Sequence, residues 1–274
     1  MSAFDPVPCV LDGVIRKDGI VPLRATAEAL THGEGLFESL PVVDGRPKFL
    51  PAHVRRLDDG ARALGFGPGP TEADVIADVG AIAAACGGAT FSLRLVLFRE
   101  GAAIRRLATA DVMPAEAGKP VSLVVAAKEF DGPRALGRYK TLNYLVPRLA
   151  HREAALRGAD EALFTTHDGF VLEGTRSTLF LVTDGVLRTP PLSMPILPGV
   201  TRDVILAAAC KRGVPVREET FPVGELFAAD EVFISASVRG LRPVARFEGR
   251  ALRGVGGPVT RSLQEGYAAA FASG

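Results

Sequence analysis

Asp-Gly dipeptides that separate short apolar segments constrain the fold of this chain more than any other feature. Four of them, at 12–13, 44–45, 168–169 and 184–185, lie between segments of strand-like composition. Asp-Gly favours the positive φ angles of the tight turns that join antiparallel strands. The sequence therefore predicts two β-hairpins in each half of the chain.

Helical patterns follow the hairpins in both halves. Residues 53–64 place apolar side chains on one helical face, and Thr71-x-x-Asp74 marks the start of a helix that extends to about residue 85. Later helices are predicted over residues 142–156 and from near Thr201 to Gly213. Further strands are predicted at residues 91–98, 121–127, 232–235 and 244–247. Hairpins followed by helices in each half indicate an α+β fold with two domains.

The length of 274 residues also fits about two domains. Residues 129–134, with the sequence Glu-Phe-Asp-Gly-Pro-Arg, break all periodicity and are the best linker candidate. The predicted organisation is a small N-terminal domain of residues 1–128, a linker of residues 129–137 and a large domain of residues 138–274.

The charge balance and the cysteines exclude several classes of protein. Lys+Arg number 32 and Asp+Glu 31, so a nucleic-acid-binding surface is not expected. The three cysteines are scattered and the four histidines lack metal-ligand spacing, which predicts neither disulfides nor a metal site. The chain has no N-terminal signal pattern and no apolar run of about 18 residues, so we expect a cytoplasmic protein with no membrane partner.

Lysine is scarce, which shortens the list of candidates for amine chemistry. Of the six lysines, five lie in turns or near the ends of predicted elements. Lys140 lies between the predicted linker and the next helix, with Asn143 and Tyr144 close behind it. A lysine at a domain junction can have a lowered pKa and act as a nucleophile. The alternative is a solvated or salt-bridged Lys140.

The predicted helix near Thr201 is a second candidate site. Residues 197–202, Leu-Pro-Gly-Val-Thr-Arg, lead directly into this helix. Backbone N–H groups at a helix start, together with a Thr hydroxyl and a Gly that permits close approach, suit a phosphate. The alternative is an ordinary helix start with Thr201 as the N-cap. Residues 235–237, Ser-Ala-Ser, either add hydroxyl groups to such a site or begin a turn.

The sequence leaves the roles of Glu173 and Arg56 open. Glu173 ends a short predicted strand, where its carboxylate is either solvated or paired with a pyridinium N–H in a charge-assisted hydrogen bond. Arg56 lies on a helix that carries apolar residues on one face, and an arginine in that setting is more often a surface residue.

Together these segments resemble one family, the class IV aminotransferases. These are the fold-type IV enzymes that use pyridoxal 5′-phosphate (PLP), and they include branched-chain and D-amino acid aminotransferases and 4-amino-4-deoxychorismate lyase. The matching segments, in family order, are residues 32–38, 53–57, 140–144, 160–163, 173–175, 196–202 and 229–233. The resemblance implies an α+β fold, with a small N-terminal α/β sandwich and a larger C-terminal domain that contains a pseudo-barrel sheet.

The resemblance also implies the cofactor and its ligands. Lys140 would form the internal aldimine with PLP and move the proton in a ping-pong transamination between an amino acid and a 2-keto acid. The implied cofactor-binding residues are Arg56, Val200, Thr201 and Ser237 for the phosphate, Glu173 for the pyridine nitrogen, Tyr144 for the phenolic oxygen and Leu197 for the ring. A homodimer is expected by the same resemblance.

Substrate choice stays open on the sequence. The candidate substrate-binding residues are Phe37, Arg94, Arg105 and Arg239. Branched-chain enzymes have a Tyr where this chain has Ser92, and D-amino acid enzymes have a Tyr where it has Phe37. Residues 237–241, Ser-Val-Arg-Gly-Leu, resemble a segment of some chorismate-derived lyases. The alternative function is therefore 4-amino-4-deoxychorismate lyase, which gives 4-aminobenzoate and pyruvate; a catalytically silent binding protein is the third.

Overall fold

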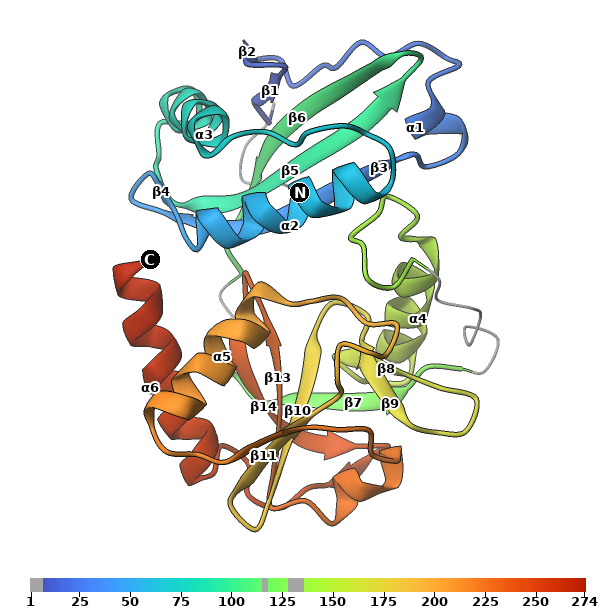
Figure 1. The fold of residues 1–274 in the computed structure, drawn as a ribbon, viewed down its shortest axis with the longest axis vertical. Helices are drawn as coiled ribbons and strands as arrows, with labels where there is room; N and C mark the ends of the chain where they lie inside the picture. The colour runs from blue at the N-terminus through green and yellow to red at the C-terminus, as the bar shows by residue number, and fades with distance from the viewer. Residues whose placement is uncertain (1–6, 115–117, 128–135) are drawn as a thin grey trace. The chain divides into compact units, whose positions relative to one another are not determined.

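The computed structural model describes residues 7–114, 118–127 and 136–274 (Figure 1). The chain divides into two compact units. Unit 1 comprises Met1–Ala115, Tyr139–Asn143 and Gly274, and unit 2 comprises Glu116–Arg138 and Tyr144–Ser273. The predicted linker at 129–137 lies outside the described residues as far as residue 135, so the predicted domain boundaries stay a prediction.

Unit 1 contains a six-stranded antiparallel sheet in the order β2-β1-β6-β5-β3-β4. Its strands are β1 (Cys9–Leu11), β2 (Val14–Arg16), β3 (Gly35–Val43), β4 (Arg46–Pro47), β5 (Phe91–Glu100) and β6 (Ala103–Asp111). The long strands β3, β5 and β6 lie side by side, so Phe37, Glu38, Arg94 and Arg105 are held by a continuous hydrogen-bonded ladder.

Two helices cover one face of this sheet. They are α2 (Leu50–Ala63) and α3 (Glu72–Cys86); a short α1 (Glu28–Thr31) precedes β3. Leu57 of α2, Ile82 of α3 and Leu93 of β5 belong to one buried cluster. Each such burial stabilises the fold by about 1.5–3 kcal/mol. The predicted capping box at the start of α3 is confirmed, because Thr71 and Asp74 exchange their side-chain and backbone hydrogen bonds.

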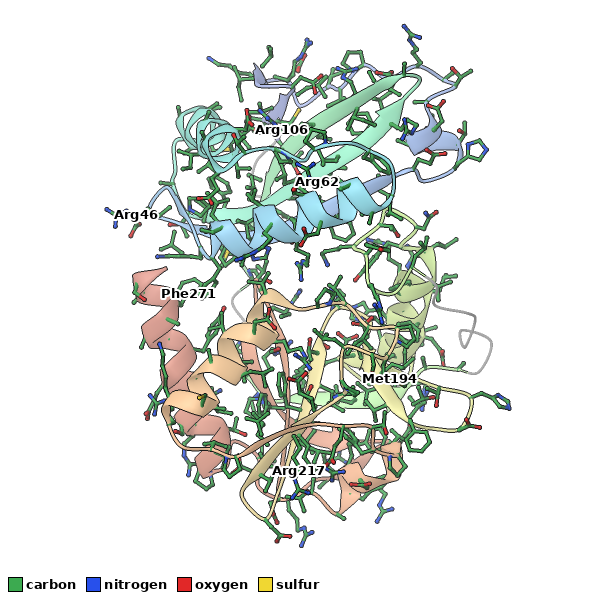
Figure 2. All side chains as sticks on the ribbon, viewed as in Figure 1. Arg46, Arg62, Arg106, Met194, Arg217 and Phe271 are labelled. Carbon is green, nitrogen blue, oxygen red and sulfur yellow. The ribbon has the colours of Figure 1, made fainter. Side chains whose placement is uncertain are left out.

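Arg106 anchors α3 to the sheet. This arginine, labelled in Figure 2, lies on β6 and forms ion pairs of 3.0 Å with Asp74 and 2.9 Å with Asp78. Asp78 is buried, and its burial raises its pKa against the opposing effect of Arg106. The sheet and α3 are thus joined by charged groups as well as by the apolar core.

The predicted hairpins are present. In the turns at 12–13, 44–45 and 184–185 both residues have positive φ, as two-residue turns between antiparallel strands require. The turn at 168–169 is longer: only Gly169 has a positive φ, and its N–H donates to the Thr166 carbonyl oxygen. This turn still joins two antiparallel strands, β8 and β9.

Unit 2 contains a nine-stranded mixed sheet in the order β12-β11-β10-β13-β14-β7-β8-β9, with β15 paired to β14. The pairs β11–β12, β7–β14 and β7–β8 are parallel. Its strands are β7 (Val121–Val125), β8 (Glu161–Thr165), β9 (Val171–Gly174), β10 (Thr178–Thr183), β11 (Val186–Thr189), β12 (Val216–Glu218), β13 (Glu231–Ala236), β14 (Gly240–Phe247) and β15 (Arg250–Ala251).

Helices pack on the sheet of unit 2. They are α4 (Leu145–Leu156), α5 (Val200–Lys211), α6 (Pro258–Ser273) and the short 3-10 helix η2 (Val223–Phe227). Ala150 and Ala154 of α4 pack on Phe164 of β8, and the rings of Phe180 and Phe233 stack 4.9 Å apart on neighbouring strands. Both units combine helices with a sheet, which confirms the predicted α+β class.

Several elements differ from the sequence prediction. The helix expected from residue 142 begins at Leu145, because the Leu142 N–H donates to the Gly35 carbonyl oxygen in unit 1. Strand β6 was not predicted, since adjacent Arg105 and Arg106 interrupt its apolar pattern, and α6 was not predicted either. Among the described residues, no helix is long and apolar enough to cross a membrane.

Candidate active site

Lys140 lies on a short segment of unit 1 that pairs with β3. The Phe37 N–H donates to the Lys140 carbonyl oxygen over 2.8 Å, and Leu36 and Thr141 form an isolated antiparallel bridge. Leu142 donates to Gly35 on the same strand. The backbone on both sides of Lys140 is thus fixed by hydrogen bonds to β3, although the lysine is distant from that strand in sequence.

The Phe37 ring contacts two of the predicted site cations. The Lys140 Nζ lies 4.4 Å from the ring centroid, and the Arg94 guanidinium carbon lies 4.0 Å from it. Phe37 itself is buried, at 3 % exposure. Attraction between a cation and an aromatic face favours this arrangement. The structure therefore brings Lys140, Phe37 and Arg94 together, and a fully solvated Lys140 does not fit its partly buried position.

Arg56 is not a surface arginine, so that alternative is wrong. Its side chain is 13 % exposed, and Nε and one terminal nitrogen donate to the two Glu38 oxygens over 2.7 and 2.6 Å. Burial alone would raise the pKa of Glu38, but the adjacent Arg56 and His53 outweigh burial and hold this pKa well below its usual range. An ionised Glu38 thus fixes the guanidinium plane of Arg56.

His53 completes this cluster on the other side of Glu38. Its Nδ1 lies 2.8 Å from the second Glu38 oxygen. Because the ionised carboxylate can only accept, Nδ1 carries the proton and donates. Burial lowers the pKa of His53 against the opposing effect of Glu38, so the ring is neutral at neutral pH. Among the described residues, its Nε2 has no hydrogen-bond partner and is buried.

Arg105 contacts two acidic side chains of unit 1. Its guanidinium forms ion pairs with Asp12, at 2.5 Å, and with Glu100. Those two carboxylates already take the positions that a substrate carboxylate would occupy. Arg105 therefore fits the role of substrate ligand less well than Arg94.

In unit 2, Glu173 is buried at the end of β9. The residue is 8 % exposed, which contradicts the solvated alternative, and one carboxylate oxygen accepts from the Leu197 N–H over 3.1 Å. Tyr144, at the start of α4, donates its hydroxyl proton to the Thr175 carbonyl oxygen over 2.6 Å.

The first turn of α5 has chemistry that suits an anion. Its N-cap is Gly199, and no side chain caps it, so the alternative with Thr201 as N-cap is wrong. The first N–H groups of a helix have no intrahelical partner, and the helix dipole adds positive potential there. Thr201 is 3 % exposed, and its hydroxyl donates to the Ser237 hydroxyl over 3.4 Å. Val200, Thr201 and Ser237 are thus grouped as predicted for a phosphate.

Buried side chains hold this turn in place. Arg202 is 1 % exposed and donates to the Pro190 carbonyl oxygen and to Glu218. Tyr267 of α6 donates to the Ser237 carbonyl oxygen over 3.5 Å, and burial raises the pKa of Tyr267 to about 12. Neither residue was assigned a role from the sequence.

Glu173 and the start of α5 form two ends of a site in unit 2 that fits one elongated ligand. The Glu173 carboxylate is bonded to the backbone of Leu197, three residues before the first residue of α5. A buried carboxylate suits a protonated ring nitrogen, and the uncapped helix start suits a phosphate. Adding a Cβ to Gly199 would bring it within 3.1 Å of the Thr178 hydroxyl, so the glycine keeps this turn open.

Some residues of the site were missed or remain apart. Glu38 and His53 had no predicted role; a carboxylate inside an otherwise apolar strand was the available signal for Glu38. Arg239, the remaining substrate candidate, lies between β13 and β14 and lines a pocket of unit 2. Among the described residues, no group of His, Cys, Asp or Glu side chains could hold a metal ion.

Comparisons with known proteins agree with these features. The family model described as amino-transferase class IV matches residues 35–247. A protein of Methanocaldococcus jannaschii, named provisionally as a branched-chain-amino-acid aminotransferase, is 33% identical over 87% of each chain. The bifunctional aminodeoxychorismate lyase / D-amino acid transaminase of Mycobacterium tuberculosis is 31% identical over 88% of this chain and 91% of its own.

The solved structures agree as well. A hypothetical aminotransferase from Mycobacterium tuberculosis, in its PLP-bound form, superposes with a TM-score of 0.83 at 30% identity. The match covers 97% of this chain and 99% of that chain. Similarity of this extent holds for the fold as a whole and not only for one motif.

Proposed function

The chain belongs to the class IV aminotransferase family, and from this premise we propose that it transfers an amino group between an amino acid and a 2-keto acid with PLP as cofactor. The family relationship supports PLP-dependent chemistry, and a similar solved structure is described as PLP-bound. The residue roles below extend this relationship to individual side chains of unit 1 and unit 2.

One observation carries the proposal: the Glu173 carboxylate accepts from the backbone of Leu197, which leads directly into the uncapped start of α5. PLP has a phosphate at one end and a pyridine nitrogen at the other. The α5 turn, with Val200, Thr201 and Ser237, binds the phosphate, and Glu173 holds the proton on the pyridine nitrogen.

PLP supplies an electron sink next to the substrate Cα when it is bound. Glu173 favours that role, because its negative charge stabilises the protonated ring nitrogen. Tyr144 binds the phenolic oxygen of the ring, and Leu197 packs on the ring face. In this structure the Tyr144 hydroxyl proton goes to the Thr175 carbonyl oxygen, so this proton would turn to the phenolic oxygen when the cofactor is bound.

Unit 1 supplies the amine and the remaining phosphate ligand. Lys140 would hold the cofactor through its Nζ, and its free amine would hold and move the proton of the substrate Cα. Arg56 binds the phosphate, with its guanidinium oriented by Glu38. Two substrates bind in turn, which gives ping-pong kinetics.

Arg94 is the substrate-carboxylate ligand that we favour. It shares the Phe37 ring with Lys140, whereas Arg105 is engaged by Asp12 and Glu100. A guanidinium is the natural partner of a carboxylate because it donates two parallel hydrogen bonds. Phe37 then sets the distance between the carboxylate ligand and the amine.

The purified protein tests this proposal directly. We expect a visible absorption band, and borohydride reduction followed by mass spectrometry should find the cofactor on the peptide that contains Lys140. Lys140→Ala should lose both signals. A colourless protein that cannot be loaded with PLP would instead indicate a catalytically silent binding protein.

Aminodeoxychorismate lyase is the second candidate function. The Mycobacterium tuberculosis relative carries this activity together with D-amino acid transamination in its name. A panel of D-alanine, L-leucine and aminodeoxychorismate separates the two. Conversion to pyridoxamine phosphate with an amino acid supports transamination, and pyruvate release from aminodeoxychorismate without an amino acceptor supports the lyase.

We further infer a homodimer, on the resemblance to the family. Light scattering on the PLP-loaded protein tests it. A mass near 57.6 kDa, twice the 28.8 kDa of one chain, is expected, and a mass of one chain would contradict it.

A further inference from the structure

Two buried glutamates of unit 2 lie in segments that resemble the family but have no role in the function proposed above. Glu161 begins β8 and is 4 % exposed, and Glu231 begins β13 and is 3 % exposed. Burying a carboxylate is unfavourable unless hydrogen bonds compensate for the lost water. The groups that each carboxylate holds therefore indicate its role.

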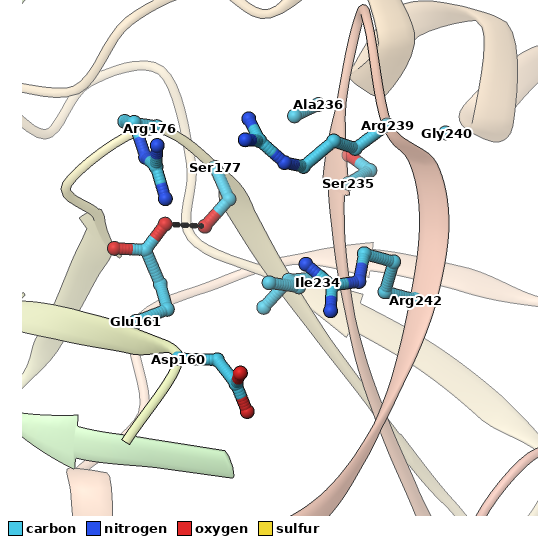
Figure 3. Close-up of a pocket in the computed structure, with 10 residues that line it drawn as sticks. All are labelled: Asp160, Glu161, Arg176, Ser177, Ile234, Ser235, Ala236, Arg239, Gly240 and Arg242. Atoms are coloured by element: carbon cyan, nitrogen blue, oxygen red, sulfur yellow. Dashed lines mark hydrogen bonds between the residues drawn. The ribbon is translucent and has the colours of Figure 1, made fainter. Parts of the chain in front are cut away.

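Glu161 holds the turn that follows β9. One of its oxygens accepts from the Thr175 N–H over 3.1 Å and also from the Thr175 hydroxyl. The other oxygen accepts from the Ser177 hydroxyl over 3.2 Å, and Figure 3 shows these two side chains pointing toward each other. The Gly174 N–H closes the turn by donating to the Ser177 carbonyl oxygen over 2.7 Å. Two of the four residues in this turn are thus tied directly to one buried carboxylate.

Gly174 brings the turn directly against Glu161. A Cβ on Gly174 would lie 2.1 Å from the Ser177 hydroxyl oxygen and 3.3 Å from the Glu161 carboxyl carbon, so a side chain does not fit here. Gly174 also directly follows Glu173 on β9. The carboxylate of Glu161 therefore limits how the backbone next to Glu173 can move.

Both oxygens of Glu161 are in use as acceptors. The Ala162 N–H donates over 3.1 Å to the oxygen that also holds Thr175. His151 of α4 faces the same carboxylate, with its Nδ1 3.9 Å from that oxygen. Burial and the adjacent Arg176 lower the pKa of His151, so this ring is neutral at neutral pH. Glu161→Gln keeps the size of the side chain but replaces one acceptor oxygen with a donor, so it should loosen the turn.

We propose that Glu161 is a positioning residue for Glu173. It holds the turn that directly follows Glu173, and so it sets the direction in which the Glu173 carboxylate meets the pyridine nitrogen of the cofactor. The Leu197 N–H fixes one oxygen of that carboxylate over 3.1 Å, and Glu161 fixes the backbone behind it. This inference rests on the role of Glu173 in the proposed function.

PLP that is isotope-labelled at its ring nitrogen tests this in the loaded protein. The NMR signal of that nitrogen reports whether it carries a proton, and a pH titration gives the midpoint at which the proton is lost. Glu161→Gln and Thr175→Val each remove a bond that holds the turn. Glu231→Gln is the matched control, because Glu231 also begins a strand and accepts from two backbone N–H groups, those of Val259 and Thr260.

We expect Glu161→Gln to lower the midpoint by about one pH unit, because a displaced Glu173 stabilises the protonated ring nitrogen less well. Thr175→Val should shift the midpoint in the same direction by a smaller amount. Glu231→Gln should leave it unchanged while it lowers stability. In a Glu173→Gln background, Glu161→Gln should cause no further shift, since the residue through which it acts is gone.

An unchanged midpoint in Glu161→Gln would overturn the inference, as would an equal shift in Glu231→Gln or a further shift in the Glu173→Gln background. If Glu161→Gln does not fold, Thr175→Val decides in its place. A wild type that does not take up PLP contradicts the proposed function, and the inference fails with it. A wild type that loads with PLP but gives any of the three contrary results contradicts the inference alone.

Discussion

The Lys140 Nζ lies 4.4 Å from the centroid of the Phe37 ring, and the Phe37 N–H donates to the Lys140 carbonyl oxygen. One residue of β3 thus positions both the backbone and the amine of the lysine. The same ring contacts Arg94, which places this guanidinium group beside the lysine amine.

Phe37→Leu should keep the backbone bond and lose the aromatic contacts. Cation–aromatic contacts contribute about 0.5–2 kcal/mol, so kcat/KM should fall roughly 3- to 30-fold. The matched control is Phe66→Leu, which removes a similar contact with Arg99, at 5.1 Å, elsewhere in unit 1. A similar kinetic loss in both variants would show that the effect is not local to Lys140.

Arg94→Ala should raise KM or lower kcat/KM, because the substrate carboxylate loses its charged partner. The change should correspond to a loss of about 2–4 kcal/mol in binding or transition-state free energy. Arg105→Ala should leave kinetics nearly unchanged and lower the free energy of unfolding, since it breaks the pairs with Asp12 and Glu100. Steady-state kinetics and urea melts of both variants check this. Kinetic loss only in Arg105→Ala would reverse the assignment.

Thr201→Ala should weaken PLP binding about tenfold, because the phosphate loses a hydroxyl donor at the start of α5. Affinity for pyridoxal, which lacks the phosphate, should stay unchanged in the same variant. Spectroscopic titration of the apoprotein with both compounds measures the difference. Equal losses for PLP and pyridoxal would mean that Thr201 acts through the fold.

The Glu38–Arg56 pair should make stability depend on pH. The pKa of Glu38 is held below its unfolded value of about 4.3, because Arg56 and His53 outweigh burial. Its contribution is therefore present above about pH 4.3 and is lost as the pH falls toward the folded pKa. Urea melts between about pH 7 and pH 3 should show this loss in the wild type and a flatter profile in Glu38→Gln.

Glu38→Gln should also lower stability at neutral pH by about 3–5 kcal/mol, since it leaves Arg56 charged and poorly paired in a buried position. Glu34→Gln is the control, because the Glu34–Arg99 pair is exposed, with side-chain exposures of 45% and 26%. Its effect should stay within about 1 kcal/mol. Equal costs for the two variants would mean that burial of the Glu38 pair is unimportant.

Local turn and cap chemistry made much of the fold predictable. Asp-Gly turns and the Thr71–Asp74 box depend on backbone angles and hydrogen bonds within a few residues, so sequence alone specifies them. Strand β6 depends instead on its pairing with β5 across the sheet, and its arginines are tolerated because Arg105 and Arg106 find acidic partners. Such partners are distant in sequence and leave no local pattern.

The residues of the candidate site also differ in how far the sequence alone predicts them. Glu173, Thr201 and Lys140 lie in recognisable short segments, whereas the roles of Glu38, His53 and Tyr267 depend on contacts between elements. The interpretation of Thr201 as an N-cap failed because Gly199 ends the preceding extended segment two residues earlier.

Residues Tyr139–Asn143 belong to unit 1, although the chain on both sides of them belongs to unit 2. No single cut can therefore separate the two units with their residues intact. A fragment that ends at residue 114 would contain Phe37, Glu38 and Arg56 but lack Lys140. If two relatives were recombined at that boundary, unit 1 of one protein would be joined to a lysine segment that evolved to pair with β3 of the other. Exchanges that preserve this pairing should therefore transfer residues 139–143 together with the N-terminal part.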